Sequence, residues 1–583
     1  MGDSKNIVGT VVGITNPREF YFSIAPGKVQ LQEIVAVDAY ELNEAGGKKD
    51  ETVRVWAKVV EIERINPLFP QEVAQELSFQ QMSAFDTVIP LSREMITAKC
   101  DVLGLENEKG ELQPLTYPLQ PASSVYIPAK ENVEELVIGG IPDYRKLHIG
   151  HLRSKPEFKI FIDGHAIVAR HLAVLAATGA GKTVTVRRIL EELIERDYPI
   201  LIFDPHGDYF GLKEIFPNKV EVYYPMIYLS EEQDFGVISY IAGLSGEIPS
   251  AAQENLIRGL LDVYRSGQNF IDTRIRPNSE RDYNLNLETH HFYALLELLN
   301  VLQHLSEMEE WNDEIVPELN RISRRVIQNL GSSGNAVSRM LYKSADAYRS
   351  MKSANQFGHE GQKKLPKPSQ IDELISKGRV SILNLEGYTD EIRQSIVSSV
   401  MRKLLDLRVS GKEISKDDKK EAIRINRFLT VIEEAHNFIP SSSEGGFVPS
   451  LPILKQVATE GRKYGMGLVL ISQRPSRVDS TILSQCNSFI ILKIINPSDQ
   501  KYVCDVVESI GEKDARILPD LATGEALITG ECIRFPMLAK IEMPKSKGKH
   551  EEEDFIKGFV TEIPKKSKVG SLKSEGLPLL KKQ

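Results

Sequence analysis

The N-terminal part of the chain has the polarity pattern of short strands. Up to about residue 125, runs rich in β-branched and aromatic residues alternate in polarity and are separated by turn-forming residues. The clearest runs are 7–14, 19–24, 51–62 and 122–128. Short strands at this spacing predict a small all-β barrel or sandwich over residues 1–125. This part carries no recognisable catalytic motif, so we interpret it as a docking or assembly domain.

The pattern changes from about residue 165, where apolar strands alternate with amphipathic helices. The predicted strands are 171–176, 198–204, 379–385, 427–433, 467–472 and 488–494. Nearly continuous apolar strands separated by helices are typical of a parallel sheet that is covered on both faces. The sequence therefore predicts an α/β core in two parts, residues 126–244 and residues 366–545.

Two segments do not fit the strand–helix alternation of the core. Residues 245–365 are rich in Leu, Glu, Arg and Gln at helical spacing, which predicts a helical insertion. Residues 546–583 are rich in Lys and poor in apolar residues. We expect them to form a flexible tail whose lysines serve solvation.

Composition and charge narrow the class of protein. With 583 residues, 41% of them hydrophobic, the chain is long enough for several hydrophobic cores. No apolar run approaches the ~20 residues of a membrane-spanning helix, and the first residues hold no secretory core, so we expect a cytoplasmic protein without a membrane anchor.

The net charge of -9 argues against binding nucleic acid over the whole surface but allows a local basic channel. The four cysteines lie far from one another without CxxC or His pairing, which suggests neither a disulfide framework nor a zinc site.

A phosphate-binding loop follows the first predicted core strand. Residues 176–183 read AATGAGKT and precede a helical pattern, which is the setting that a GxxxxGK[ST] loop requires. Backbone N–H groups at the positive end of a helix can bind phosphate oxygens, Lys182 would reach the β and γ phosphates of ATP, and Thr183 would offer a hydroxyl to Mg²⁺. We therefore assign nucleotide contacts to Thr178, Gly179, Ala180, Gly181, Lys182, Thr183 and Val184.

The loop departs from the usual pattern at its first position, where Ala176 replaces glycine. If this position needed a left-handed backbone, alanine would cost about 1 to 2 kcal/mol. We predict instead a negative φ at Ala176 and an intact phosphate cradle.

Two acids end the strand predicted at 427–433. We assign Glu433 to Mg²⁺ through water, and Glu434 to the activation of the attacking water as a general base. A second acid after this strand is expected of an enzyme that hydrolyses ATP repeatedly and is not needed by a small-molecule kinase. The alternative is a structural pair of capping acids at the strand end.

Two further strand ends carry polar residues that belong near the nucleotide. In open parallel sheets the carboxyl ends of the strands form the ligand crevice, so Gln473 could contact the γ-phosphate or the attacking water. Asp204 and His206, in DPHGDYF, are placed for the nucleotide pocket or for a moving loop. For Gln473 an ordinary polar loop stays open, and for Asp204 and His206 simple turn chemistry stays open.

The order of these motifs resembles the HerA family of hexameric DNA translocases. The resemblance covers residues 5 to 545 and rests on RHLAVLAATGAGKT, ILIFDPHGDY, VIEEAHNF, EGRKYGMGLVLISQRPS and the closing segment GEALITGECIRFPMLAKIEM. It implies a RecA-like P-loop ATPase core with an N-terminal HAS barrel. It also implies a ring that moves double-stranded DNA in end resection and recombinational repair with a NurA-type nuclease, which the barrel would meet.

The resemblance also implies that Lys182, Thr183, Glu434 and Gln473 are catalytic-motif residues. Arg170 and Arg462 resemble the family's arginines at the subunit interface, where a neighbour's arginine can stabilise charge on the γ-phosphate. The alternative for each is a surface arginine on a turn. Glu433 departs from relatives in the wider superfamily that have Asp.

Other functions stay open on the sequence. An ATPase of the same type could move protein or a relaxase-bound strand, or the nucleotide could switch a scaffold. A motor that travels over any DNA sequence should contact phosphates rather than bases. For such contacts the sequence offers only Lys343, Arg349 and Lys352 as candidates.

Overall fold

The computed structural model describes somewhat more than half of the chain. The described residues are 6–24, 27–42, 48–65, 95–106, 112–224, 363–388 except 365 and 367, 390–410, 427–441, 448–511 and 515–548. The helical insertion predicted at 245–365, apart from 363–364, lies outside them, as do Lys343, Arg349 and Lys352 and the tail beyond 548. In the described part of the chain, no helix is long and apolar enough to span a membrane.

The N-terminal domain is a closed antiparallel barrel. Six strands follow one another in the order β2-β1-β7-β3-β4-β5, and β5 pairs back to β2. They are β1 (Asn6–Val12), β2 (Glu19–Ile24), β3 (Ile34–Leu42), β4 (Lys48–Ile65), β5 (Met95–Glu106) and β7 (Ser124–Ile127), and the short β6 (Leu112–Gln113) pairs antiparallel with the end of β5. Apolar side chains such as Phe20, Phe22 and Val55 fill the interior. The predicted barrel is confirmed, although β3 and β5 were not among the predicted runs.

A sheet of twelve strands forms the second domain, in the order β13-β12-β14-β11-β15-β16-β10-β17-β18-β19-β8-β9. Strands β13 (Lys363–Lys364), β12 (Val220–Tyr224), β14 (Val380–Asn384), β11 (Ile200–Asp204), β15 (Phe428–Ile432), β16 (Met466–Ser472), β10 (Leu172–Leu175) and β17 (Ser488–Ile491) are parallel. The antiparallel strands β18 (Glu525–Gly530), β19 (Met537–Ile541), β8 (Lys146–Leu152) and β9 (Lys159–Asp163) complete it. All six predicted core strands are confirmed.

Helices cover both faces of the parallel part, because the strand side chains alternate between two cores. Ala173 and Leu175 of β10 face the core formed with α12 (Asp390–Ser410), α13 (Ser450–Glu460), α14 (Ser480–Leu483) and α15 (Pro497–Val506). Leu172 and Val174 face the core formed with α4 (Gly164–Arg170), α5 (Lys182–Glu195) and α6 (Gly211–Ile215). The sheet is therefore buried on both sides, as the apolar strands predicted.

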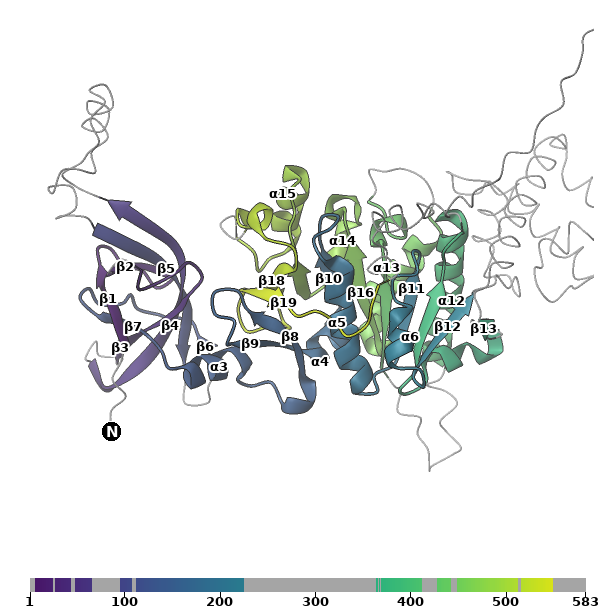
Figure 1. The fold of residues 1–583 in the computed structure, drawn as a ribbon, viewed down its shortest axis with the longest axis horizontal. Coiled ribbons are helices and arrows are strands. Elements are labelled where there is room, and N and C mark those ends of the chain that lie inside the picture. Colours follow the sequence, from purple (N-terminus) through teal and green to yellow (C-terminus); the bar gives the residue numbers. More distant parts are fainter. Residues whose placement is uncertain are drawn as a thin grey trace, which may run out of the picture.

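The barrel packs against the antiparallel end of the sheet, as Figure 1 shows. Trp56 and Tyr126 of the barrel belong to the same buried cluster as residues of β8 and β9. Lys58 Nζ donates to the carbonyl oxygen of Pro536 at 3.3 Å, and Lys155 forms an ion pair of 2.7 Å with Glu33. Helix α3 (Lys130–Ile138) follows the barrel and contacts β9.

Candidate nucleotide-hydrolysis site

The phosphate loop connects β10 to α5 at the carboxyl edge of the sheet. Gly179 and Gly181 have φ values of 76° and 100°, in the left-handed region that favours glycine. Helix α5 begins at Lys182, so the first N–H groups of its N-terminal turn have no partner within the helix. The backbone N–H of Gly524 donates to the carbonyl oxygen of Ala180 at 3.0 Å and ties the loop to the start of β18. The loop thus has the conformation and the positive helix end that an anion requires.

Ala176 fits the loop without a left-handed backbone. Its φ is not positive, and its N–H donates to the carbonyl oxygen of Ser472 on β16 at 3.2 Å. The side chain is fully buried in the core below the loop. The predicted negative φ is confirmed, so the missing glycine causes no backbone strain here.

Lys182 contacts both acids that follow β15. Its Nζ lies 2.6 Å from Oε1 of Glu433 and 2.7 Å from Oε1 of Glu434. Burial by itself lowers the pKa of Lys182, but the two carboxylates outweigh it and raise this pKa above its usual value. Burial also raises the pKa of Glu433, against the opposing effect of Lys182. The lysine is therefore held as a cation between the two acids that follow β15.

The strand order explains why these groups meet. Strand β16 lies between β10 and β15, and all three are parallel, so their carboxyl ends share one edge. Gln473 directly follows β16, and its Nε2 donates a very short hydrogen bond to Oε1 of Glu434. On its other side, Oε1 of Gln473 accepts a hydrogen bond of 2.5 Å from the hydroxyl of Thr178. Gln473 therefore connects the phosphate loop with the second acid.

Glu434 holds an unusual backbone conformation. Its φ of 51° is left-handed for a non-glycine residue, just before the 3₁₀ turn Ala435–Asn437. Such a conformation costs on the order of 1–3 kcal/mol and persists where the surroundings enforce it, frequently at functional sites. Oε2 of Glu434 lies 3.4 Å from Nδ1 of His436, whose ring is 3.3 Å from the hydroxyl of Ser472. The side chain is thus approached from three sides by polar groups.

Asp204 ends β11 beside this cluster and is fully buried. Its two carboxylate oxygens accept hydrogen bonds from the backbone N–H groups of residues 206–209, at 2.8 to 3.2 Å. Burial raises the pKa of Asp204 to about 7. These contacts fit the turn alternative, and a nucleotide contact of Asp204 stays a prediction.

Tyr209, in the turn that Asp204 organises, is a site residue that the sequence reasoning missed. Its hydroxyl donates a 2.5 Å hydrogen bond to Oε2 of Glu433, and the side chain is fully buried. The only signal for it was its place in DPHGDYF, directly after the acid and the glycine.

Arg170 and Arg462 lie at the opposite edge of the sheet from the loop. Arg170 ends α4 just before β10 and forms an ion pair with Glu531. Arg462 is exposed on the turn Gly461–Tyr464, just before β16. Both therefore precede strands whose other ends carry the phosphate loop and Gln473, so neither belongs to the cluster around Lys182.

The residues present fit a nucleoside triphosphate and a hard cation. The loop offers backbone N–H groups, a helix N-terminus and the Lys182 ammonium, which suit phosphate oxygens. Thr183, in the first turn of α5, and the carboxylate of Glu433 are oxygen donors of the kind that Mg²⁺ takes. A phosphate loop of this form, on a parallel sheet with two acids at the end of a nearby strand, defines a P-loop ATPase with a RecA-like core.

Comparison with known proteins shows which family this ATPase resembles. Residues 147–404 match the family model described as "Helicase HerA, central domain". The chain is 27% identical to a probable helicase of Methanocaldococcus jannaschii, over 92% of this chain and 95% of that protein. It is 26% identical to the DNA double-strand break repair helicase HerA of Saccharolobus solfataricus, over 94% and 95% of the two chains. These matches show that the chain is similar to proteins of the HerA family over most of its length.

Solved structures show a more distant similarity. VirB4 of Thermoanaerobacter pseudethanolicus aligns with a TM-score of 0.45 at 14% identity, over 70% of this chain and 99% of that chain. A likeness at this distance carries no information about function.

Proposed function

We propose that the protein is an ATP-driven motor that moves double-stranded DNA. In this proposal it works as a hexameric ring, with translocase and helicase activity, in DNA end resection and recombinational repair. The observation that carries the proposal is the contact of Glu434 with both Lys182 and Gln473 at the phosphate loop. The names of the relatives support the DNA substrate, since several are DNA double-strand break repair helicases.

In the proposed mechanism the loop binds ATP and Lys182 holds the β and γ phosphates. Lys182 would then exchange its present contacts with Glu433 and Glu434 for phosphate oxygens. Thr183 and, through water, Glu433 would hold Mg²⁺, which when bound offsets negative charge on the phosphates. Tyr209 would fix the orientation of the Glu433 carboxylate through its hydrogen bond to Oε2.

Glu434 would accept the proton of the attacking water. Once Lys182 turns to phosphate, Oε1 of Glu434 keeps the hydrogen bond from Gln473 and can receive one from water. Gln473 also holds the hydroxyl of Thr178, which belongs to the phosphate loop. If the loop moves when the γ-phosphate is lost, this contact at the tip of β16 would change. The proposal assigns Gln473 to this sensing role.

The two arginines would serve the next subunit. Their place at the far edge of the sheet prevents them from reaching the phosphate loop of their own chain. In a ring, this edge could face the nucleotide of a neighbour, where an arginine is worth about 10³ to 10⁵ in rate. Arg170 would have to release Glu531 to do so.

The barrel would bind a NurA-type nuclease. It lies beside the antiparallel end of the sheet, and its strands β1 and β2 lie on the side away from the ATPase domain (Figure 1). DNA would contact basic loops through its phosphates, and binding should weaken steeply as salt increases.

The experiment is an ATPase assay of the full chain with and without long linear duplex DNA, and with and without a purified NurA-type nuclease. Particle mass is measured in parallel. The proposal predicts a multimer of ring size and a rate that duplex DNA stimulates. A slow rate that is insensitive to DNA would overturn the motor and favour a nucleotide-switched scaffold. Lys182→Ala serves as the control, because it should abolish hydrolysis in every arm.

A further inference from the structure

Two histidines of β8 share a face because the strand contains a bulge. Residues three apart in a regular strand point to opposite faces. The pairing of β8 with β9 shifts register between His148 and Gly150, so one extra residue, Ile149, is inserted. His148 and His151 consequently lie together, with ring centroids 5.6 Å apart. A side chain at position 150 would meet the carbonyl oxygen of Lys540 at 2.1 Å, so the bulge depends on Gly150.

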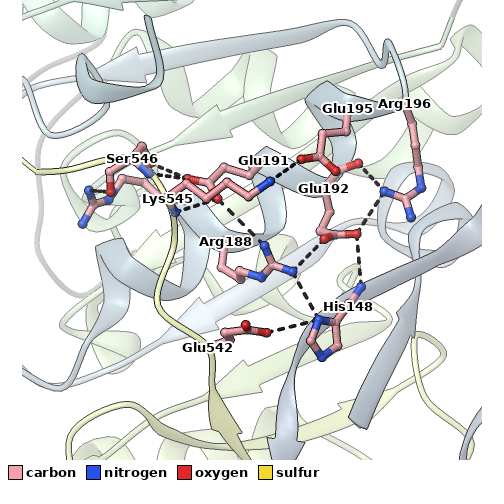
Figure 2. A network of polar contacts seen from close by, with 10 residues as sticks. His148, Arg188, Glu191, Glu192, Glu195, Arg196, Glu542, Lys545 and Ser546 are labelled. Carbon is pink, nitrogen blue, oxygen red and sulfur yellow. Dashed lines mark hydrogen bonds and ion pairs between the residues drawn. The ribbon is translucent and has the colours of Figure 1, made fainter. Parts of the chain in front are cut away.

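A carboxylate from the neighbouring strand completes the group. Glu542 follows β19, and its N–H donates to the carbonyl oxygen of Ile149 at 2.9 Å. Its Oε2 lies 3.1 Å from Nδ1 of His148, a contact that Figure 2 shows. One donor atom each from His148, His151 and Glu542 lie within 4.8 Å of one another.

The contacts of His148 place a hydrogen on Nε2 and direct Nδ1 toward Glu542 and Arg188. Nε2 lies 3.1 Å from the carbonyl oxygen of Gly150, which can only accept, so Nε2 carries the hydrogen. Nδ1 lies 3.3 Å from Nη2 of Arg188, which can only donate. In the neutral ring with its hydrogen on Nε2, Nδ1 and the carboxylate of Glu542 are two electron-pair donors 3.1 Å apart, which a cation could bridge.

Two buried atoms of the group, one of them the oxygen that faces Nδ1 of His148, make no hydrogen bond within the described residues. They are Nδ1 of His151 and Oε2 of Glu542. A buried polar atom without a partner costs about 1–3 kcal/mol. A cation between the three side chains would satisfy both atoms and remove the repulsion between Nδ1 of His148 and Glu542.

We propose that His148, His151 and Glu542 bind a zinc-type divalent ion at the junction of β8, β19 and α5. Two imidazoles and a carboxylate match the ligands that Zn²⁺ takes when one coordination position is left to water. The hydrogen bond from Nε2 of His148 to a backbone carbonyl is the usual support of a metal-binding histidine. The side chain of Glu542 is 43% exposed, so an ion can enter from solvent.

Arg188 contacts the site and has other partners, and Lys159, which pairs with His151 across β8 and β9, is a second cation nearby. Nη2 of Arg188 donates to Glu192 at 2.7 Å, and its Nη1 lies 3.9 Å from Glu191, both on α5 (Figure 2). Metal binding would replace only its 3.3 Å contact with His148. Because α5 begins at the phosphate loop, the ion would join β8 and β19 next to the helix that carries Lys182.

The test uses the untagged full chain, stripped with a chelator and free of nucleotide, and Co²⁺ as a spectroscopic probe. The proposal predicts the strong visible absorption of four- or five-coordinate Co²⁺, its displacement by Zn²⁺, and a higher melting temperature with Zn²⁺. His151→Ala and Glu542→Gln should each weaken Zn²⁺ binding by at least about tenfold. His165→Ala removes an exposed histidine outside the group and should bind as the wild type does.

Two results would overturn the proposal. One is a wild-type chain that shows only the weak spectrum of hydrated Co²⁺ and no thermal shift with Zn²⁺. The other is unchanged Zn²⁺ affinity in both His151→Ala and Glu542→Gln. Circular dichroism of each variant shows whether it is folded, and the wild-type measurement decides independently of the variants.

Discussion

Replacing Glu434 by Gln should stop hydrolysis while leaving the site intact. The amide oxygen of a glutamine can accept the two hydrogen bonds that Oε1 of Glu434 now accepts, from Lys182 and Gln473. The amide nitrogen would take the place of Oε2, 3.4 Å from Nδ1 of His436, to which it can donate. Lys182 also keeps Glu433 at 2.6 Å. The substitution therefore removes a base without creating a cavity or an unpaired buried charge.

The expected loss follows from the missing proton acceptor. General base catalysis contributes about 10²–10⁴ in rate, which is roughly 3 to 5 kcal/mol of barrier. ATP affinity should be unchanged or higher, because a neutral amide competes less with phosphate for Lys182. Single-turnover hydrolysis measures the rate, and titration with a fluorescent ATP analogue measures the affinity.

A matched control separates the missing base from a general loss of charge. Glu460→Gln changes an exposed acid at the end of α13 and should hydrolyse ATP like the wild type. A Glu434→Gln rate within about threefold of the wild type would refute the reasoning, since a general base is worth far more. Loss of ATP binding would also refute it, because the substitution leaves Lys182 and its contact with Glu433 in place.

Three further predictions test the surroundings of this acid. Tyr209→Phe deletes the hydrogen bond to buried Glu433 and should cost about 1.5–3 kcal/mol of stability, seen as a lower unfolding midpoint in urea. Burial raises the pKa of Asp204 to about 7, above about 3.9 in an unfolded chain, so its contribution to stability falls as pH rises from about 4 through 7. Asp204→Asn should therefore flatten the fall in melting temperature over that range. Mixing Arg462→Ala with Glu434→Gln subunits should restore part of the ATPase activity, and no rescue at any ratio would argue against an arginine acting on a neighbour.

The cluster around Lys182 could be predicted because short motifs specify it locally. A strand, a glycine-containing loop and a helix place Lys182 wherever the chain folds as a parallel sheet. The acids at 433 and 434 follow a strand of the same sheet, so the carboxyl-edge rule brings them to the loop. Tyr209 escaped prediction because its contact with Glu433 spans distant positions, and no local pattern reports which hydroxyl faces a buried acid.

Strand β3 of the barrel was not predicted, for a different physical reason. Ile34 and Ala36 pack into the core shared with the ATPase domain, whereas Val35 and Val37 fill the barrel. A strand buried on both faces loses the alternation of polar and apolar residues that marks a half-buried strand. The bulge at Ile149 is equally invisible in the sequence, because strand register depends on the partner strands.

The placement of the arginines limits how they can act. Strand β10 has four residues, which is about 13 Å at 3.3 Å per residue, and it separates Arg170 from the loop that follows. A side chain that points from the amino edge cannot reach a phosphate beyond the carboxyl edge of the same sheet. If Arg170 or Arg462 stabilises a γ-phosphate, that phosphate must be bound to another copy whose carboxyl edge faces this amino edge. A contact between two different edges is heterologous, so repeating it gives either a closed ring or an open filament. The mixing experiment reports whether such a contact completes the active site, and particle mass reports whether it closes.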